Sequence, residues 1–105
     1  MTEPTLTAEI VTFRTLPGTP AHITRNAAEG IGPALVRCQG FLARTLSLGE
    51  DGTWTDHVLW ERPDLAHRAA ERIMAEPEGR AFMALIDPAS VRMTHAPVMV
   101  AQKAA

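Results

Sequence analysis

Residues 40–61 of this chain read GFLARTLSLGEDGTWTDHVLWE, and this stretch decides the fold. Two runs rich in leucine, threonine, tryptophan and valine flank residues 49–52, Gly-Glu-Asp-Gly. Glycine and acidic residues favour the tight turn that joins two paired strands, because they tolerate positive φ. The stretch therefore predicts a β-hairpin whose strands cover residues 41–48 and 53–61.

Helical patterns lie on either side of the hairpin. Apolar residues recur at helical spacing over residues 20–38, and Gly30, Gly32 and Pro33 inside this segment predict a kink or a break. A second helix is predicted over residues 63–76, because a proline opens it and its apolar residues share one face. A further helical turn or two follows before the last strand.

Two more strands, residues 8–14 and 91–100, complete the order βαββαβ. Hairpin pairing and right-handed crossovers then favour an α+β, ferredoxin-like, four-stranded antiparallel sheet with helices on one face. A chain of 105 residues holds one such core. We therefore expect a single domain over residues 1–105, with its core at about residues 8–98.

The predicted strands carry apolar residues on both sides. Leu42, Leu46 and Leu48 share one face of the second strand, and Phe41 and Ala43 share the other. The helices of this fold cover only one face of the sheet. Because soluble monomers rarely expose a large apolar patch, we expect a second copy of the chain to cover the other face in a homodimer.

Composition excludes several classes of partner. Hydrophobic residues make up 46% of the chain and charged residues 21%, which is typical of a globular domain. The formal net charge is −2 and the basic residues are scattered, so neither a nucleic-acid surface nor a polybasic membrane patch is expected. No secretory signal or membrane helix is predicted, and Cys38 is the single cysteine, which suits a reducing cytoplasm.

Three short segments are typical of one family: VTFRTLPG at residues 11–18, GFLAR at residues 40–44, and VLWE at residues 58–61 followed by an alanine-rich helix. They resemble the antibiotic-biosynthesis-monooxygenase-like (ABM-like) dimeric α+β barrel superfamily. The resemblance spans about residues 8–98. The resemblance implies a dimeric barrel with a ligand pocket between sheet and helices in each subunit. Members of this family oxygenate aromatic polyketides without a cofactor, degrade haem or isomerise small molecules.

The haem-degrading branch of that family does not match this chain. By alignment, its asparagine on the first strand and its later tryptophan and histidine fall at Val11, Ile73 and Met83. The sequence also has no glycine-rich phosphate loop, no His-Glu-x-x-His motif and no nucleophile elbow. We therefore predict no cofactor and no metal.

Polar residues inside the apolar strands are the candidates for a site. Glu9 shares a face with Phe13, which the resemblance makes the pocket side, and Arg44 interrupts a row of leucines. On the third strand either His57 or Asp56 faces the pocket, and the pattern leaves both open. The structural alternatives to a role in the site are an ion pair between Arg44 and Asp56, and a solvated position for Glu9 at the start of its strand.

A catalytic role needs a base. His57 and His95 are the candidates, because an imidazole titrates near neutral pH, although each could instead satisfy a backbone carbonyl in the core or at an interface. Arg44 would hold a developing oxyanion, and Trp60 with Phe13 would wall the pocket.

The function predicted on this basis is a cofactor-independent enzyme, of monooxygenase or proton-transfer type, for an aromatic or enolic and mostly apolar small molecule. The alternative is a non-catalytic dimeric module that binds a small ligand or is purely structural. A pocket that carries a histidine would favour the first, a pocket lined only by carbon the second, and the absence of a cavity a structural dimer.

Overall fold

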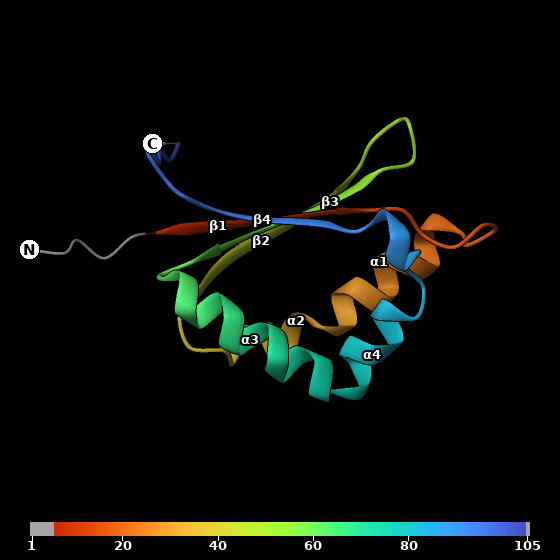
Figure 1. Cartoon of the computed structure of the whole chain (residues 1–105), viewed down its shortest axis with the longest axis horizontal. Coiled ribbons are helices and arrows are strands. Elements are labelled where there is room, and N and C mark those ends of the chain that lie inside the picture. The colour runs from red at the N-terminus through yellow and green to blue at the C-terminus, as the bar shows by residue number, and fades with distance from the viewer. Residues whose placement is uncertain (1–5, 105) are drawn as a thin grey trace, which may run out of the picture.

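A computed structural model describes residues 6–104, so residues 1–5 and 105, which flank the predicted core, lie outside it. Figure 1 shows a sheet with the helices on one side and a 3₁₀ turn (Pro88–Ser90) before the last strand. In chain order the elements are β1 (Thr7–Phe13), α1 (Ala21–Gly30), α2 (Gly32–Val36), β2 (Phe41–Leu48), β3 (Trp54–Trp60), α3 (Pro63–Ala75), α4 (Pro77–Met83) and β4 (Arg92–Pro97).

The sheet has the order β2-β3-β1-β4, and all neighbouring strands are antiparallel. This is the α+β, ferredoxin-like βαββαβ topology, so the predicted fold class is confirmed. The break predicted near Gly30, Gly32 and Pro33 separates α1 from α2. This break does not turn the chain back on itself, because the φ and ψ of Ile31 between the two helices stay in the right-handed helical region.

The core lies between the sheet and the helices. Phe13 of β1 stacks on Trp54 of β3, and its ring meets the edge of Phe82 from α4. Ala66 and Ala69 are buried on the inner face of α3, where their small side chains let the helix approach the sheet. Aromatic contacts of this kind contribute about 0.5–1.5 kcal/mol each beyond burial.

A β-bulge corrects the prediction for the start of β2. Phe41 pairs with Trp60 and Ala43 with Leu59, so one extra residue, Leu42, lies between two consecutive pairs. Phe41 therefore lies on the helix side, with its ring edge against Trp60 at a centroid distance of 5.7 Å. The prediction that Phe41 and Ala43 share one face of the strand is wrong, because the bulge shifts the alternation by one residue.

The face of the sheet away from the helices consists mainly of small residues. Three rows run across β2, β3, β1 and β4: Ala43-Leu59-Ala8-Ala96, Thr45-His57-Ile10-Thr94 and Ser47-Thr55-Thr12-Arg92. The β2–β3 hairpin and the C-terminal segment extend on this side of the sheet (Figure 1). Within residues 6–104, no helix is both long and apolar enough to cross a membrane.

Candidate functional site

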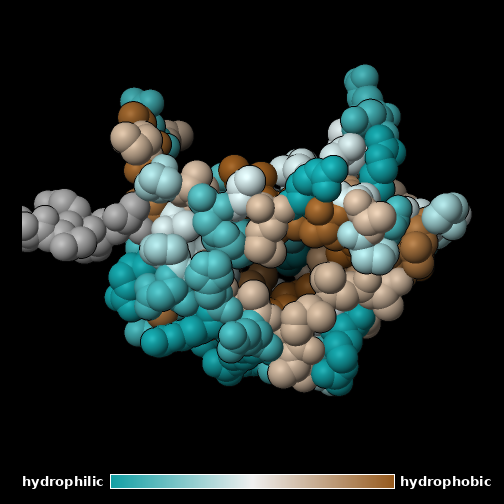
Figure 2. Space-filling view, in the orientation of Figure 1, coloured by the Kyte–Doolittle hydropathy of each residue, from teal (hydrophilic) through white to brown (hydrophobic). Residues whose placement is uncertain are grey.

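A cavity of about 350 Å³ lies between the sheet and the helices. Figure 2 shows the surface hollowed there, with hydrophobic side chains inside the hollow. Side chains from β1, β3, β4 and the helices α2, α3 and α4 surround it, and most of them are apolar. The lining residues are Glu9, Val11, Phe13, Ile31, Leu35, Asp56, Trp60, Ala69, Ala70, Ile73, Met74, Gly79, Phe82, Met83, Ile86, Val91 and Met93.

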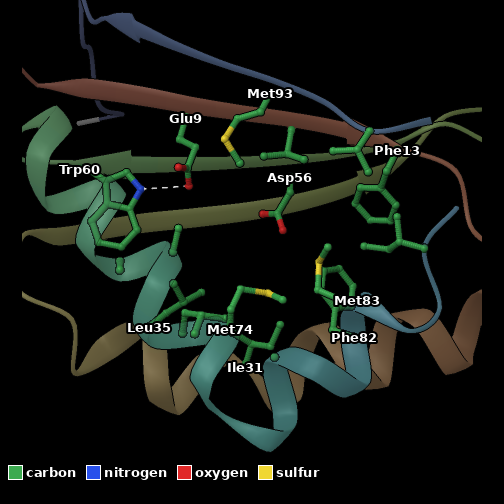
Figure 3. A pocket seen from close by; sticks show the side chains of 17 residues that line it. Glu9, Phe13, Ile31, Leu35, Asp56, Trp60, Met74, Phe82, Met83 and Met93 are labelled. Atoms are coloured by element: carbon green, nitrogen blue, oxygen red, sulfur yellow. Dashed lines mark hydrogen bonds between the residues drawn. The ribbon is translucent and has the colours of Figure 1, made fainter. Parts of the chain in front are cut away.

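Glu9 places a carboxylate inside this cavity. The alternation of β1 sends Glu9, Val11 and Phe13 toward the helices, as predicted, and Figure 3 shows the Glu9 carboxylate directed away from the sheet. Its Oε2 lies 2.7 Å from Nε2 of His95, and its Oε1 accepts a long bond of 3.4 Å from the indole N–H of Trp60. The alternative of a solvated Glu9 is therefore excluded.

His95 lies behind Glu9 and does not line the cavity itself. The pairing of β1 with β4 sets Glu9 directly opposite His95, and their side chains are only 11% and 20% exposed. The ring of His67, on α3, lies 4.7 Å from the ring of His95. His67 belongs to the site only through this contact, and no motif in the sequence pointed to it.

Of the two residues left open on β3, Asp56 and not His57 faces the cavity, on the same side of the strand as Trp60. It lies opposite Val11 on β1, and its carboxylate points into the cavity (Figure 3). Arg44 donates to both of its oxygens, over 2.9 and 2.7 Å, and also donates to the carbonyl of Ala28 over 2.8 Å. The expected ion pair between Arg44 and Asp56 is thus present and partly buried.

Arg44 does not line the cavity that holds Glu9. It lies beside a second, more open groove of about 690 Å³ between α1 and the edge of the sheet, which Trp54 also lines. All of its described bonds go to Asp56 and Ala28. A guanidinium held in this way fixes Asp56 and is not placed to meet an oxyanion in the apolar cavity that holds Glu9.

His57 points the other way. It pairs with Ile10 and Thr45 on the open face of the sheet and is exposed. The prediction that His57 shares the helix–sheet pocket is therefore wrong in placement. Successive side chains of a strand alternate between faces, so a cavity that receives Asp56 cannot receive His57.

Trp60 and Phe13 form walls of the cavity, as predicted. Three methionines also line it and remain partly exposed, so they lie where the cavity meets solvent: Met74, Met83 and Met93. Methionine side chains are flexible and adapt to the shape of what they contact. The pocket-lining aromatics were predicted from the sequence, but these methionines were not, because their spacing is equally typical of an ordinary core.

Cys38 lies outside the cavity. Its thiol is buried at the end of α2 and donates to the carbonyl of Ala34 over 3.3 Å. Burial is the main cause that raises the pKa of the Cys38 thiol, so this residue is not a ready nucleophile. Within the described part of the chain, no three His, Cys, Asp or Glu side chains are grouped as a metal site requires.

Solved structures with the same fold cover nearly the whole chain. A "putative antibiotic biosynthesis monooxygenase" from Bordetella bronchiseptica is 14% identical, with a TM-score of 0.78 over 91% of this chain and 99% of that one. SnoaB, a cofactor-independent oxygenase from Streptomyces nogalater, is 21% identical, with a TM-score of 0.64 over 94% and 96% of the two chains. A Nitrosomonas europaea protein of unknown function is 15% identical, with a TM-score of 0.69 over 97% of each chain.

These likenesses confirm the resemblance noted in the sequence at the level of fold. The chain has the ABM-like fold, and proteins that share this fold include an oxygenase as well as a protein of unknown function. No family model and no curated protein matches the sequence.

Proposed function

We propose that this protein is a cofactor-independent enzyme that moves a proton on a small, mostly apolar aromatic or enolic molecule, either for oxygenation or for isomerisation. The observation that carries the proposal is the carboxylate of Glu9, buried in a carbon-lined cavity and bonded to His95 over 2.7 Å. A base held inside an apolar cavity is the arrangement that proton abstraction needs.

Glu9 takes the place that the sequence analysis assigned to a histidine. It is the carboxylate in the cavity that no arginine engages, since Asp56 accepts two bonds from Arg44. His95 acts as the positioning residue, because its Nε2–H holds Oε2 and leaves Oε1 toward the cavity. Trp60 packs beside Oε1 and limits the direction from which a substrate can approach.

The chemistry balances without a prosthetic group. The Oε1 atom of Glu9 removes a proton from an activated carbon or phenol, and the electron pair of the broken bond stays on the substrate. In the oxygenation branch this carbanion adds dioxygen, the peroxide anion regains the proton from Glu9, and loss of water leaves a carbonyl group. In the isomerisation branch the same proton returns to another atom of the substrate.

The fold supports this proposal, since SnoaB is described as a cofactor-independent oxygenase and shares the architecture at 21% identity. The carbon-rich wall of the cavity also fits the second candidate function, a module that binds an apolar ligand and does not turn it over. A single cysteine that is free and buried is compatible with a protein that acts in the cytoplasm.

An anthrone provides a direct test, because its methylene group lies between two aromatic rings and loses a proton readily. Under nitrogen in D₂O, NMR follows exchange of the methylene protons; in air, an oxygen electrode follows dioxygen uptake. We expect the protein to accelerate exchange, and Glu9→Gln to lower the rate by about 10²–10⁴-fold, the usual contribution of a general base.

His57→Gln is the matched control, because it makes the same type of change on the opposite face of the sheet and should leave the rate unchanged. Binding of the anthrone with no acceleration of exchange would instead establish the ligand-binding module. Loss of activity in His57→Gln with retention in Glu9→Gln would contradict the assignment of the base.

We also propose that the protein works as a homodimer through the open face. Ile10 and Leu59 are the large apolar side chains of the three rows on that face, and the alanine, serine and threonine residues around them allow close sheet-to-sheet contact. Light scattering should give the mass of two chains at micromolar concentration, and Leu59→Glu should give the mass of one. A wild-type mass of one chain would refute the dimer.

A further inference from the structure

The cavity offers hydrogen-bond acceptors and almost no donor. Among the described residues that line it, the polar side chains are Glu9, Asp56 and Trp60. The indole N–H of Trp60 already points at Glu9, and Arg44 reaches the oxygens of Asp56 without lining the cavity. A ligand inside the cavity therefore meets carboxylate oxygens and carbon.

The two carboxylates lie on the same face of adjacent strands. Glu9 pairs with Val58 and Asp56 pairs with Val11, so Glu9 and Asp56 are diagonal neighbours across β1 and β3. The Cα atoms of diagonal neighbours in an antiparallel pair are about 7–8 Å apart, which is close to the length of a fused two-ring molecule. Figure 3 shows both carboxylates directed from the sheet toward the helices, with Met74 and Met83 facing them from α3 and α4.

Both carboxylates keep unused acceptor capacity. Each carboxylate oxygen has two lone pairs, and the contacts described use only one on each. A hydroxyl or amide N–H of a ligand would supply the missing donors. A carboxylate on the ligand would lose its water and find no donor in return, which is strongly unfavourable.

We infer that the cavity selects a neutral fused-ring aromatic molecule with hydrogen-bond donors at two opposite ends, and that it rejects carboxylates of the same shape. This inference deepens the proposed function and relies on it for treating the cavity as the ligand site. It also explains how a substrate anion forms without a cationic partner: the negative charge spreads over the ligand's own rings.

The test compares naphthalene-2,6-diol with naphthalene-2,6-dicarboxylate, which place donors or charged acceptors at the same positions of one ring system. Titration calorimetry on the full chain at pH 7 and physiological salt measures both affinities. The diol should bind at least about 30-fold more tightly, since hydrogen bonds to charged groups contribute strongly when they are desolvated.

Two variants should change the ratio of the affinities for the diol and the dicarboxylate in a predicted direction. Glu9→Gln removes one acceptor charge and adds a donor, so the ratio of the two affinities should fall about tenfold. Met93→Lys, on an exposed position that lines the cavity, should improve binding of the dicarboxylate and remains informative if Glu9→Gln fails to fold. Met99→Lys is the matched control, because Met99 is 86% exposed and does not line the cavity.

Equal affinity for the two probes, or no detectable binding of the diol at millimolar concentration, would overturn the inference. An unchanged ratio in both Glu9→Gln and Met93→Lys would also overturn it. Because the titration measures binding at equilibrium and is run under nitrogen, where no dioxygen can add to the diol, the result is independent of oxygenation. Selective binding of the diol together with an inert anthrone would leave this inference standing and defeat the proposed function.

Discussion

Breaking the ion pair between Arg44 and Asp56 tests most directly how the wall of the cavity is held together. The two side chains are 14% and 12% exposed, and two hydrogen bonds of 2.9 and 2.7 Å join them. In Asp56→Asn the guanidinium keeps its bond to the carbonyl of Ala28 but loses the neutralising charge. Breaking a buried pair in this way typically costs 3–5 kcal/mol, and partial exposure places the expected loss at about 3 kcal/mol.

Urea unfolding measures this loss, and the protein concentration is held fixed because the stability of the proposed dimer would depend on it. For a domain of this size, a loss of about 3 kcal/mol lowers Tm by about 15 °C. Replacing both partners, as in Arg44→Met with Asp56→Leu, should cost less than Asp56→Asn alone, since no unpaired charge remains.

The control is Glu29→Gln, which removes a carboxylate from an exposed pair with Arg25 at 3.7 Å. Its expected effect is below about 0.5 kcal/mol. If Asp56→Asn and Glu29→Gln cost the same, or if the double replacement costs more than Asp56→Asn, the ion pair does not hold the wall of the cavity as described.

The remaining predictions concern the thiol, one glycine and the absorption spectrum. Burial raises the pKa of the Cys38 thiol, so this thiol should react slowly with a thiol reagent until the protein unfolds. The stability that the protonated thiol contributes is complete below the ordinary thiol pKa and is lost as pH rises through the raised pKa. Gly79→Ala should cost about 2 kcal/mol in urea unfolding, because its Cβ would collide with the carbonyl oxygen of Ile73, whereas Gly30→Ala meets open space and should cost nothing. The purified protein should show no visible absorption band; a stoichiometric flavin or haem spectrum would contradict the predicted absence of a cofactor.

Local sequence signals determined most of the architecture. The strand β2 covers residues 41–48 as predicted, and α3 begins at Pro63, where a proline opens the helix. Gly52 in the predicted turn has a φ of 86°, which glycine adopts without strain. These signals are readable because turns, caps and alternation depend on neighbouring residues.

The sequence indicated the ion pair between Arg44 and Asp56 within the hairpin, but tertiary structure decided which other polar residues meet. Alternation in β3 puts Asp56 and His57 on opposite faces, but only the pairing with β1 and β2 shows which face receives the helices. Glu9 and His95 are 86 residues apart, and the register between β1 and β4 sets them opposite each other. The contact of His67 with His95 needs α3 to dock beside the sheet. Register and docking depend on packing between distant segments, which no local pattern encodes.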